Sequence, residues 1–143
     1  MFLDPNIRWK PVPTIIDGIG RPPYALNCGL HRDGLHLLVT HGDTDYGVTI
    51  PCEVYFGVEE MLHSVMPHGP GAAYDGSTYL KEAEGSALIG SLEKHDPVQR
   101  TFRHYLFVGG DFCYETAGVD DPVIVKFESR QAADAWANKV VTQ

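Results

Sequence analysis

Positive charge is absent from a long part of this chain. No lysine or arginine occurs between Asp33 and Leu80, and residues 33–93 carry ten acidic side chains against Lys81 alone, a net of -9 in a chain whose total is -8. Nucleic acids and anionic membranes are bound through Lys and Arg. The charge therefore argues against both as partners and favours a basic protein partner.

Cysteine is scarce as well. Cys28, Cys52 and Cys113 are odd in number and widely spaced, which argues against a disulfide framework and is typical of free thiols in a cytoplasmic protein. No run approaches the ~18 apolar residues of a membrane span. The first residues lack the basic region and apolar run of a signal peptide. We therefore expect a cytoplasmic protein.

The length of 143 residues predicts a single domain, 1–143. Alternating apolar residues and frequent turn signals predict an α+β fold, with an antiparallel sheet of about six strands and two or three helices packed on one face. The predicted segments are a Pro-rich extended arm at 1–23; a hairpin, a third strand and a short helix at 24–66; a loop at 67–79; a helix at 80–95; a three-stranded meander at 101–127; and a C-terminal helix at 129–141.

Three strands are expected at the start of the domain, after a possible short edge strand at Ile15–Ile16. The first is half-buried, because its apolar residues alternate along one face, and Asp33-Gly34 turns it into the second. Pro51 interrupts the third strand, which indicates a sheet edge or a bulge. The alternating residues of the first strand are Tyr24, Leu26, Cys28 and Leu30.

Two helices are expected in the middle of the chain. Apolar residues at helical spacing from Val58 to Met66 predict a short helix with Glu59 and Glu60 outward. The segment 80–95 reads as a second helix. Because glycine disfavours helix, this helix is either stabilised by packing against the rest of the domain or interrupted near Gly85.

The structural centre is expected at Arg103–Thr116. Both faces of its first strand are largely apolar, which is typical of a central strand, and Gly109-Gly110 would turn the chain back. Leu38–Tyr46 resembles Leu106–Tyr114 in its Leu, Gly, Asp and Tyr positions. This similarity indicates either two related strand–strand–helix units or the same residue preferences in two unrelated hairpins.

Two groups of residues could carry chemistry. His41, Asp43 and Asp45 on one loop could serve a metal- or small-ligand-dependent enzyme, although Gly, Asp and Thr are also ordinary turn residues. Cys113 and His104 could form a nucleophile and its base if the hairpin places them opposite each other. Otherwise Cys113 is a small apolar core residue. The sequence assigns no catalytic residue, no metal ligand and no cofactor.

The pattern therefore favours a small acidic protein-binding domain without catalytic activity. Such a composition is typical of small bacterial immunity proteins, which block a basic toxin, and of other bacterial accessory proteins. Homo-oligomerisation through a strand edge or the Pro-rich arm is a further possibility. The expected acidic binding face consists of Asp43, Asp45, Glu53, Glu59, Glu60 and Asp75.

Overall fold

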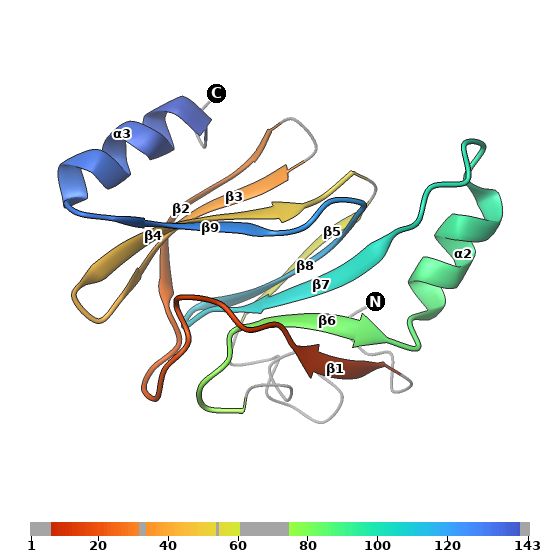
Figure 1. The fold of residues 1–143 in the computed structure, drawn as a ribbon, viewed down its shortest axis with the longest axis horizontal. Coiled ribbons are helices and arrows are strands. Elements are labelled where there is room, and N and C mark those ends of the chain that lie inside the picture. The colour runs from red at the N-terminus through yellow and green to blue at the C-terminus, as the bar shows by residue number, and fades with distance from the viewer. Residues whose placement is uncertain (1–6, 32–33, 54, 61–74, 141–143) are drawn as a thin grey trace.

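The computed structural model describes residues 7–31, 34–53, 55–60 and 75–140. Two antiparallel sheets pack face to face (Figure 1). The five-stranded sheet has the order β1-β6-β7-β8-β5, formed by β1 (Arg8–Pro11), β6 (Leu80–Glu84), β7 (Arg103–Val108), β8 (Phe112–Gly118) and β5 (Tyr55–Glu60). The four-stranded sheet has the order β2-β3-β4-β9, formed by β2 (Tyr24–His31), β3 (Gly34–His41), β4 (Thr44–Pro51) and β9 (Val123–Phe127).

The α+β class is confirmed, because antiparallel sheet dominates and two helices are described, α2 (Ala87–His95) and α3 (Arg130–Val140). The number of strands is larger than expected, and they form two sheets rather than one. Neither described helix has the length and apolar character that crossing a membrane would require.

The central hairpin is confirmed. β7 and β8 pair from Arg103↔Gly118 to Val108↔Cys113, and β6 and β5 flank them on either side. Because strands with two neighbours satisfy both backbone edges, this hairpin forms the middle of the five-stranded sheet.

The expected meander at 101–127 is wrong in its third strand. β9 does not pair with β8 but crosses to the other sheet and pairs with β4, for example Val125 with Gly47. The free edge of β8 is already taken by β5, where Val58 pairs with Tyr114. Pro51 likewise marks no edge or bulge: it ends β4, a strand between β3 and β9, at the point where the chain leaves for the other sheet.

The expected helix from Val58 is also wrong as far as the chain is described. Val58–Glu60 belong to β5, because pairing with β8 outweighs the helical spacing of the apolar residues. The side chains of Glu59 and Glu60, and residues 61–74 with most of the expected loop, lie outside the described part. Two related strand–strand–helix units were expected. In the described part of the chain, only the second unit is followed by its helix, α3.

The expected helix at 80–95 is interrupted at Gly85, which is the second of the two alternatives given for this segment. Its first half is the strand β6, which pairs with β7, and its second half is α2. Gly85 has φ +75°, a conformation that L-residues rarely adopt and glycine adopts freely. Ser86 then caps α2 by accepting the Ile89 N–H at 3.3 Å.

The helices do not share one face of a sheet, contrary to expectation. α3 begins after Ser129, whose Oγ accepts the Ala132 N–H at 3.1 Å, and covers the outer face of the four-stranded sheet. A Cβ atom on Gly47 would lie 2.9 Å from the Trp136 ring, so glycine there lets α3 approach closely. α2 instead extends from one end of the five-stranded sheet (Figure 1).

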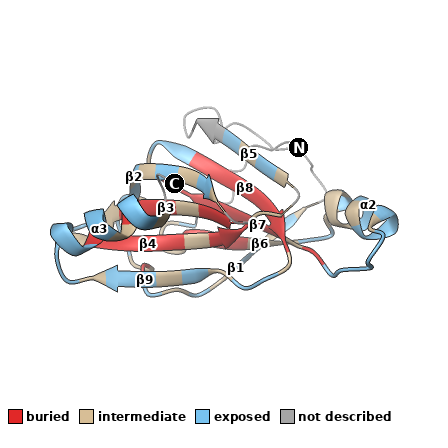
Figure 2. Ribbon diagram, turned by 90° about the horizontal axis from the view of Figure 1, so that it is seen from above, coloured by how far each residue is buried: buried red, intermediate tan, exposed pale blue. Residues whose placement is uncertain are grey.

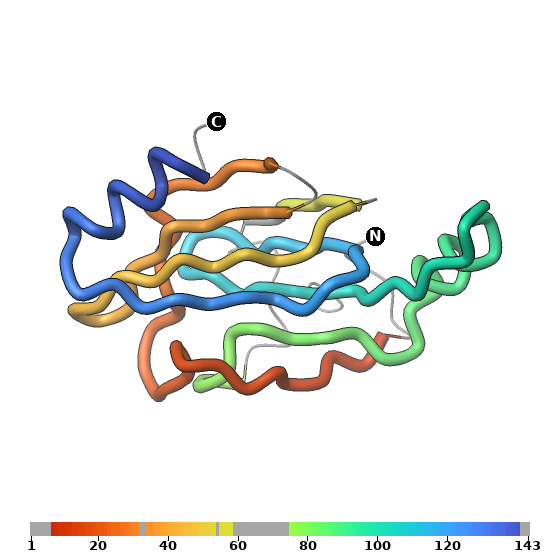
Figure 3. The backbone as a smooth tube through the Cα atoms, turned by 45° about the horizontal axis from the view of Figure 1, so that its top comes forward, coloured from red at the N-terminus to blue at the C-terminus, as the bar shows by residue number. Residues whose placement is uncertain are grey.

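The core lies between the sheets and is concentrated on β3, β4, β7 and β8 (Figure 2). In the arm at 1–23 the strand is β1 rather than Ile15–Ile16, and it runs beside β6 (Figure 3). Ile16 is buried in the core. The main core residues are Ile16, Leu35, Leu37, Val39, Tyr46, Val48, Ile50, Tyr79, Leu80, Tyr105, Phe107 and Tyr114.

Candidate functional site

The carboxylates of the expected acidic face have different surroundings. Asp45 accepts hydrogen bonds from the Arg130 guanidinium, at 2.6 Å from Nε, and this bond lowers the pKa of the carboxyl. Glu53 accepts the Val119 N–H at 2.9 Å. Asp43 is exposed on the β3–β4 turn. Two of these three carboxylates are therefore occupied in holding the fold together.

Asp75 is also engaged within the domain. It lies 2.6 Å from the ammonium of Lys81, whose side chain is only 2% exposed, and it accepts the N–H groups of Ser77 and Thr78. The Lys81 bond comes first among the interactions that hold the pKa of Asp75 far below its ordinary range. Asp75 therefore neutralises a buried lysine rather than presenting a free charge.

Acid titration tests this role of Asp75. A carboxyl whose pKa is lowered by folding contributes stability above its unfolded pKa of about 3.9 and loses it as the pH falls toward the folded value. We expect wild-type stability, measured by urea unfolding, to fall between about pH 5 and pH 2. Asp75→Asn should flatten this slope, and Asp43→Asn should not. Equal slopes in all three proteins would contradict the assignment.

The three groups of the His41 loop do not converge. His41 Nε2 lies 3.2 Å from the Tyr79 hydroxyl and borders a hollow of about 470 Å³, whereas Asp45 is tied to Arg130 and Asp43 is exposed. Within the described ranges, no group of three or more His, Cys, Asp or Glu side chains could hold a metal ion. The enzyme alternative thus gains no support from this loop.

Cys113 and His104 are not opposite each other. In the β7–β8 register Cys113 pairs with Val108, whereas His104 pairs with Ala117. Cys113 is fully buried in an apolar cluster with Leu106 and Val108. The structure therefore supports the packing interpretation of Cys113.

The clearest exposed feature is apolar. Cys28 and Leu30 on β2 pair with Leu37 and Leu35, whose side chains are in the core. Cross-strand partners point to the same face of a sheet, so Cys28 and Leu30 face the sandwich interior. Cys28 is nevertheless exposed, and Leu30 is 52% exposed.

The opposing sheet shows the same behaviour. Val58 pairs with the core residue Tyr114 but is 42% exposed. Burial raises the pKa of Tyr114 to about 12. The two sheets are thus open to solvent here. We call this surface the open flank; it consists of Cys28, Leu30, Phe56, Val58 and Phe112.

A chain of hydrogen-bonded polar side chains lies on the face of the five-stranded sheet that points away from the core. His104 Nδ1 lies 2.8 Å from the Ser86 hydroxyl, and His104 Nε2 bonds to Glu115 Oε1. The side chains of His104 and Glu115 are both fully buried. Trp9 contacts the imidazole edge-on, with 5.2 Å between the ring centroids. We call Ser86, His104 and Glu115 the serine relay.

Glu115 is a costly residue at this position. Its Oε2 has no hydrogen-bond partner in the described structure, and unpaired buried carboxylate oxygens are unfavourable. Burial, followed by the Glu115 charge, raises the pKa of Tyr55 to about 12. Sequence reasoning missed Ser86 and Glu115, although a glutamate between Cys113 and Ala117 on one face of a central strand was a detectable signal.

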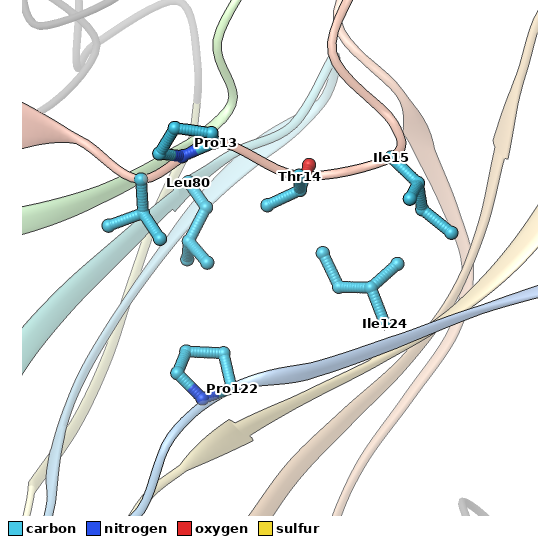
Figure 4. Close-up of a pocket in the computed structure, with 7 residues that line it drawn as sticks. Pro13, Thr14, Ile15, Leu80, Pro122 and Ile124 are labelled. Carbon is cyan, nitrogen blue, oxygen red and sulfur yellow. The ribbon is translucent and has the colours of Figure 1, made fainter.

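A third surface feature lies at the opposite flank. A hollow of about 220 Å³ is open between the segment after β1 and the start of β9 (Figure 4). Thr14 supplies its one polar side chain, and the other lining residues are Val12, Pro13, Ile15, Leu80, Pro122 and Ile124. The hollow offers little polar chemistry for orienting a ligand.

Comparisons of the chain with protein-family models, with curated proteins and with solved structures found no match.

Proposed function

We propose that the protein is a protein-binding domain that takes up an extended apolar segment of a basic partner at the open flank. The observation that carries this proposal is the exposure of interior-facing apolar side chains on both sheets at one flank. Scattered exposed apolar residues are normal, but apolar residues gathered on one surface typically mark an interaction site.

The backbone supports the extended form of the partner segment. β2 pairs only with β3, and β5 pairs only with β8, so each presents an edge that no described strand covers. An unpaired edge accepts a further strand through main-chain hydrogen bonds, with side-chain contacts supplying the selectivity. Apolar residues at alternate positions of the partner would then meet Leu30 and Val58.

Charge supports the basic flanks of that segment. Phe56 and Val58 lie within the stretch that has no lysine or arginine, and the exposed Asp111 precedes Phe112. Complementary charge raises association rates more than affinity. The partner is therefore still basic, as in the acidic-face hypothesis, but its main contact is with the apolar side chains of the open flank rather than with the carboxylates.

A peptide selection tests the proposal. Extended peptides displayed on phage are selected on the purified domain, and the affinity of the best binder is measured by fluorescence anisotropy. We expect alternating apolar residues flanked by Lys or Arg, and binding at least about tenfold weaker after Leu30→Glu or Val58→Glu. Val98→Glu is the matched control, because Val98 is 68% exposed but lies outside the open flank.

Three outcomes would contradict the proposal: no binder is selected, the control weakens binding equally, or the flank variants leave affinity unchanged. Sedimentation velocity of the free domain identifies a fourth. If the domain self-associates and Leu30→Glu makes it monomeric, the flank is occupied by a second copy of this chain instead of a basic partner.

A further inference from the structure

We propose that Ser86 is a nucleophile for acyl transfer, with His104 as its base and Glu115 as the group that orients and stabilises the imidazole. Nucleophilic serines are recognised by this geometry: hydroxyl, imidazole and carboxylate in one hydrogen-bonded chain. The chain is complete here, from Ser86 Oγ through both ring nitrogens of His104 to Glu115 Oε1. This activity goes beyond the proposed binding function.

The carboxylate fixes the direction of the chain. In the proposed reaction the Glu115 carboxylate accepts the Nε2–H of His104, which leaves the lone pair of Nδ1 facing Ser86. The hydroxyl of Ser86 therefore donates its proton to the ring. When the ring takes up that proton, the buried carboxylate stabilises the imidazolium beside it.

The backbone places Ser86, which is itself partly exposed, between two exposed residues. Ser86 stands between strand β6 and helix α2, after Gly85 with its positive φ, and both Gly85 and Ala87 are exposed. His104 and Glu115 are fully buried, so only the serine end of the chain is accessible. An accessible nucleophile backed by a shielded base and carboxylate is the arrangement that acyl transfer requires.

The first turn of α2 supplies a position for the developing negative charge. The Ile89 N–H bonds to Ser86 Oγ and the Gly90 N–H to the Ser86 carbonyl. The N–H groups of Ala87 and Leu88 have no intrahelical acceptor, as at every helix start. Adjacent to the nucleophile, they are donors for the oxyanion of a tetrahedral intermediate.

The reaction balances with water as the only co-reactant. Ser86 Oγ bonds to the carbonyl carbon of an ester, and the hydroxyl proton moves to His104 Nδ1. The alcohol leaves with that proton and the acyl group remains on Ser86. Water then attacks the acyl-serine and gives a proton to His104 Nδ1; His104 passes that proton to Ser86 Oγ, and the carboxylic acid is released. The substrate class is therefore a carboxylic ester.

The serine relay and the open flank lie on opposite faces of the five-stranded sheet. His104 and Glu115 alternate along β7 and β8 with Tyr105 and Tyr114, which point into the core that the open flank borders. Variants at one surface therefore test it without removing the other. The relay departs from the sequence-based expectation of a domain without catalytic activity.

A fluorophosphonate probe tests the proposal. In labelling, the Oγ–phosphorus bond forms, the phosphorus–fluorine bond breaks, and the proton taken by His104 leaves with fluoride. We expect one adduct by intact-protein mass spectrometry, located on Ser86 by peptide mapping. Release of nitrophenolate from p-nitrophenyl acetate should show a burst of one equivalent, followed by slow turnover.

The controls separate chemistry from folding. Ser86→Asn keeps an N-cap acceptor for α2 but removes the nucleophile, and His104→Leu with Glu115→Met removes the base and its carboxylate together. Circular dichroism should show that both variants remain folded. Ser86→Asn should give no adduct, and the labelling rate of the double variant should fall by at least about 100-fold. Ser129→Ala is the matched control, because Ser129 caps α3 in the same way, with no imidazole among its described contacts.

Folded wild-type protein that forms no adduct would overturn the proposal. So would an adduct on a serine other than Ser86, or a double variant that labels at the wild-type rate. If Ser129→Ala is labelled as wild type and Ser86→Asn is not labelled, the nucleophile proposal is supported. This outcome does not depend on whether a peptide binds the open flank.

Discussion

Replacing His104 by leucine is expected to lower the free energy of unfolding by about 3–5 kcal/mol. The substitution leaves the Glu115 carboxylate fully buried, with neither oxygen bonded to the imidazole and with Oε2 already lacking a partner. A buried charge that loses its partner is among the largest sources of destabilisation by a single substitution. This loss is a large part of the stability of a domain of this size, whose total is typically about 5–15 kcal/mol.

The double variant His104→Leu/Glu115→Met should recover most of that loss. Apolar residues of similar volume replace the buried pair without a desolvation cost, and such replacements are often neutral or stabilising. Urea unfolding of wild type, both single variants and the double variant closes a thermodynamic cycle. If the double variant is as unstable as His104→Leu, the pair does not carry the coupling that we infer from its burial.

Leu37→Ala is expected to lower the free energy of unfolding by about 3–4 kcal/mol, whereas Leu30→Ala should change it by less than about 0.5 kcal/mol. The two leucines have the same chemistry and lie on neighbouring strands, β3 and β2. Leu37 is fully buried in the core, and Leu30 is 52% exposed. Truncation therefore leaves a cavity in one case and only removes a solvated side chain in the other.

Urea midpoints at constant slope give both values. The pair also tests the open flank directly, since Leu30→Ala would be costly if the sheets closed over β2 in solution. A loss of more than about 1.5 kcal/mol in Leu30→Ala would mean that the flank is part of the core. Val48→Ala, at another fully buried position on β4, is a second reference for a core truncation.

The sequence predicts the hairpins of this fold better than its sheets. Local signals sufficed for the β7–β8 hairpin, for the pairing of β2 with β3 and for the helix after Ser129. The crossing of β9 to β4 is a contact between distant segments, and no pattern within Val123–Phe127 distinguishes β8 from β4 as its partner. The helical spacing at Val58 failed for the same reason, because a tertiary partner outweighed a local preference.

The candidate sites were less predictable than the fold. Alternation along β2 predicted one shared face, but the register shift between Ala25 and Asn27 puts Tyr24 on the other face from Cys28 and Leu30. The exposure of Cys28 and Leu30 depends on how far the opposite sheet extends. The acidic count overstated free negative charge, because Asp45 and Asp75 are bonded to Arg130 and Lys81. The serine relay joins residues from a helix start and two strands, and only the three-dimensional fold brings them into one chain.

Pairing between strands that are far apart in the sequence also determines when the fold forms during synthesis. β1 pairs with β6, so residues 8–11 have no strand partner until residue 84 has left the ribosome. β4 likewise lacks its second neighbour until Val123–Phe127 of β9 has emerged. The five-stranded sheet is complete only after β8 has been made, and the four-stranded sheet only after β9. The nascent chain therefore exposes unpaired strand edges until β6 and β9 emerge, and we expect it to depend on chaperones more than a protein whose sheets form from consecutive strands.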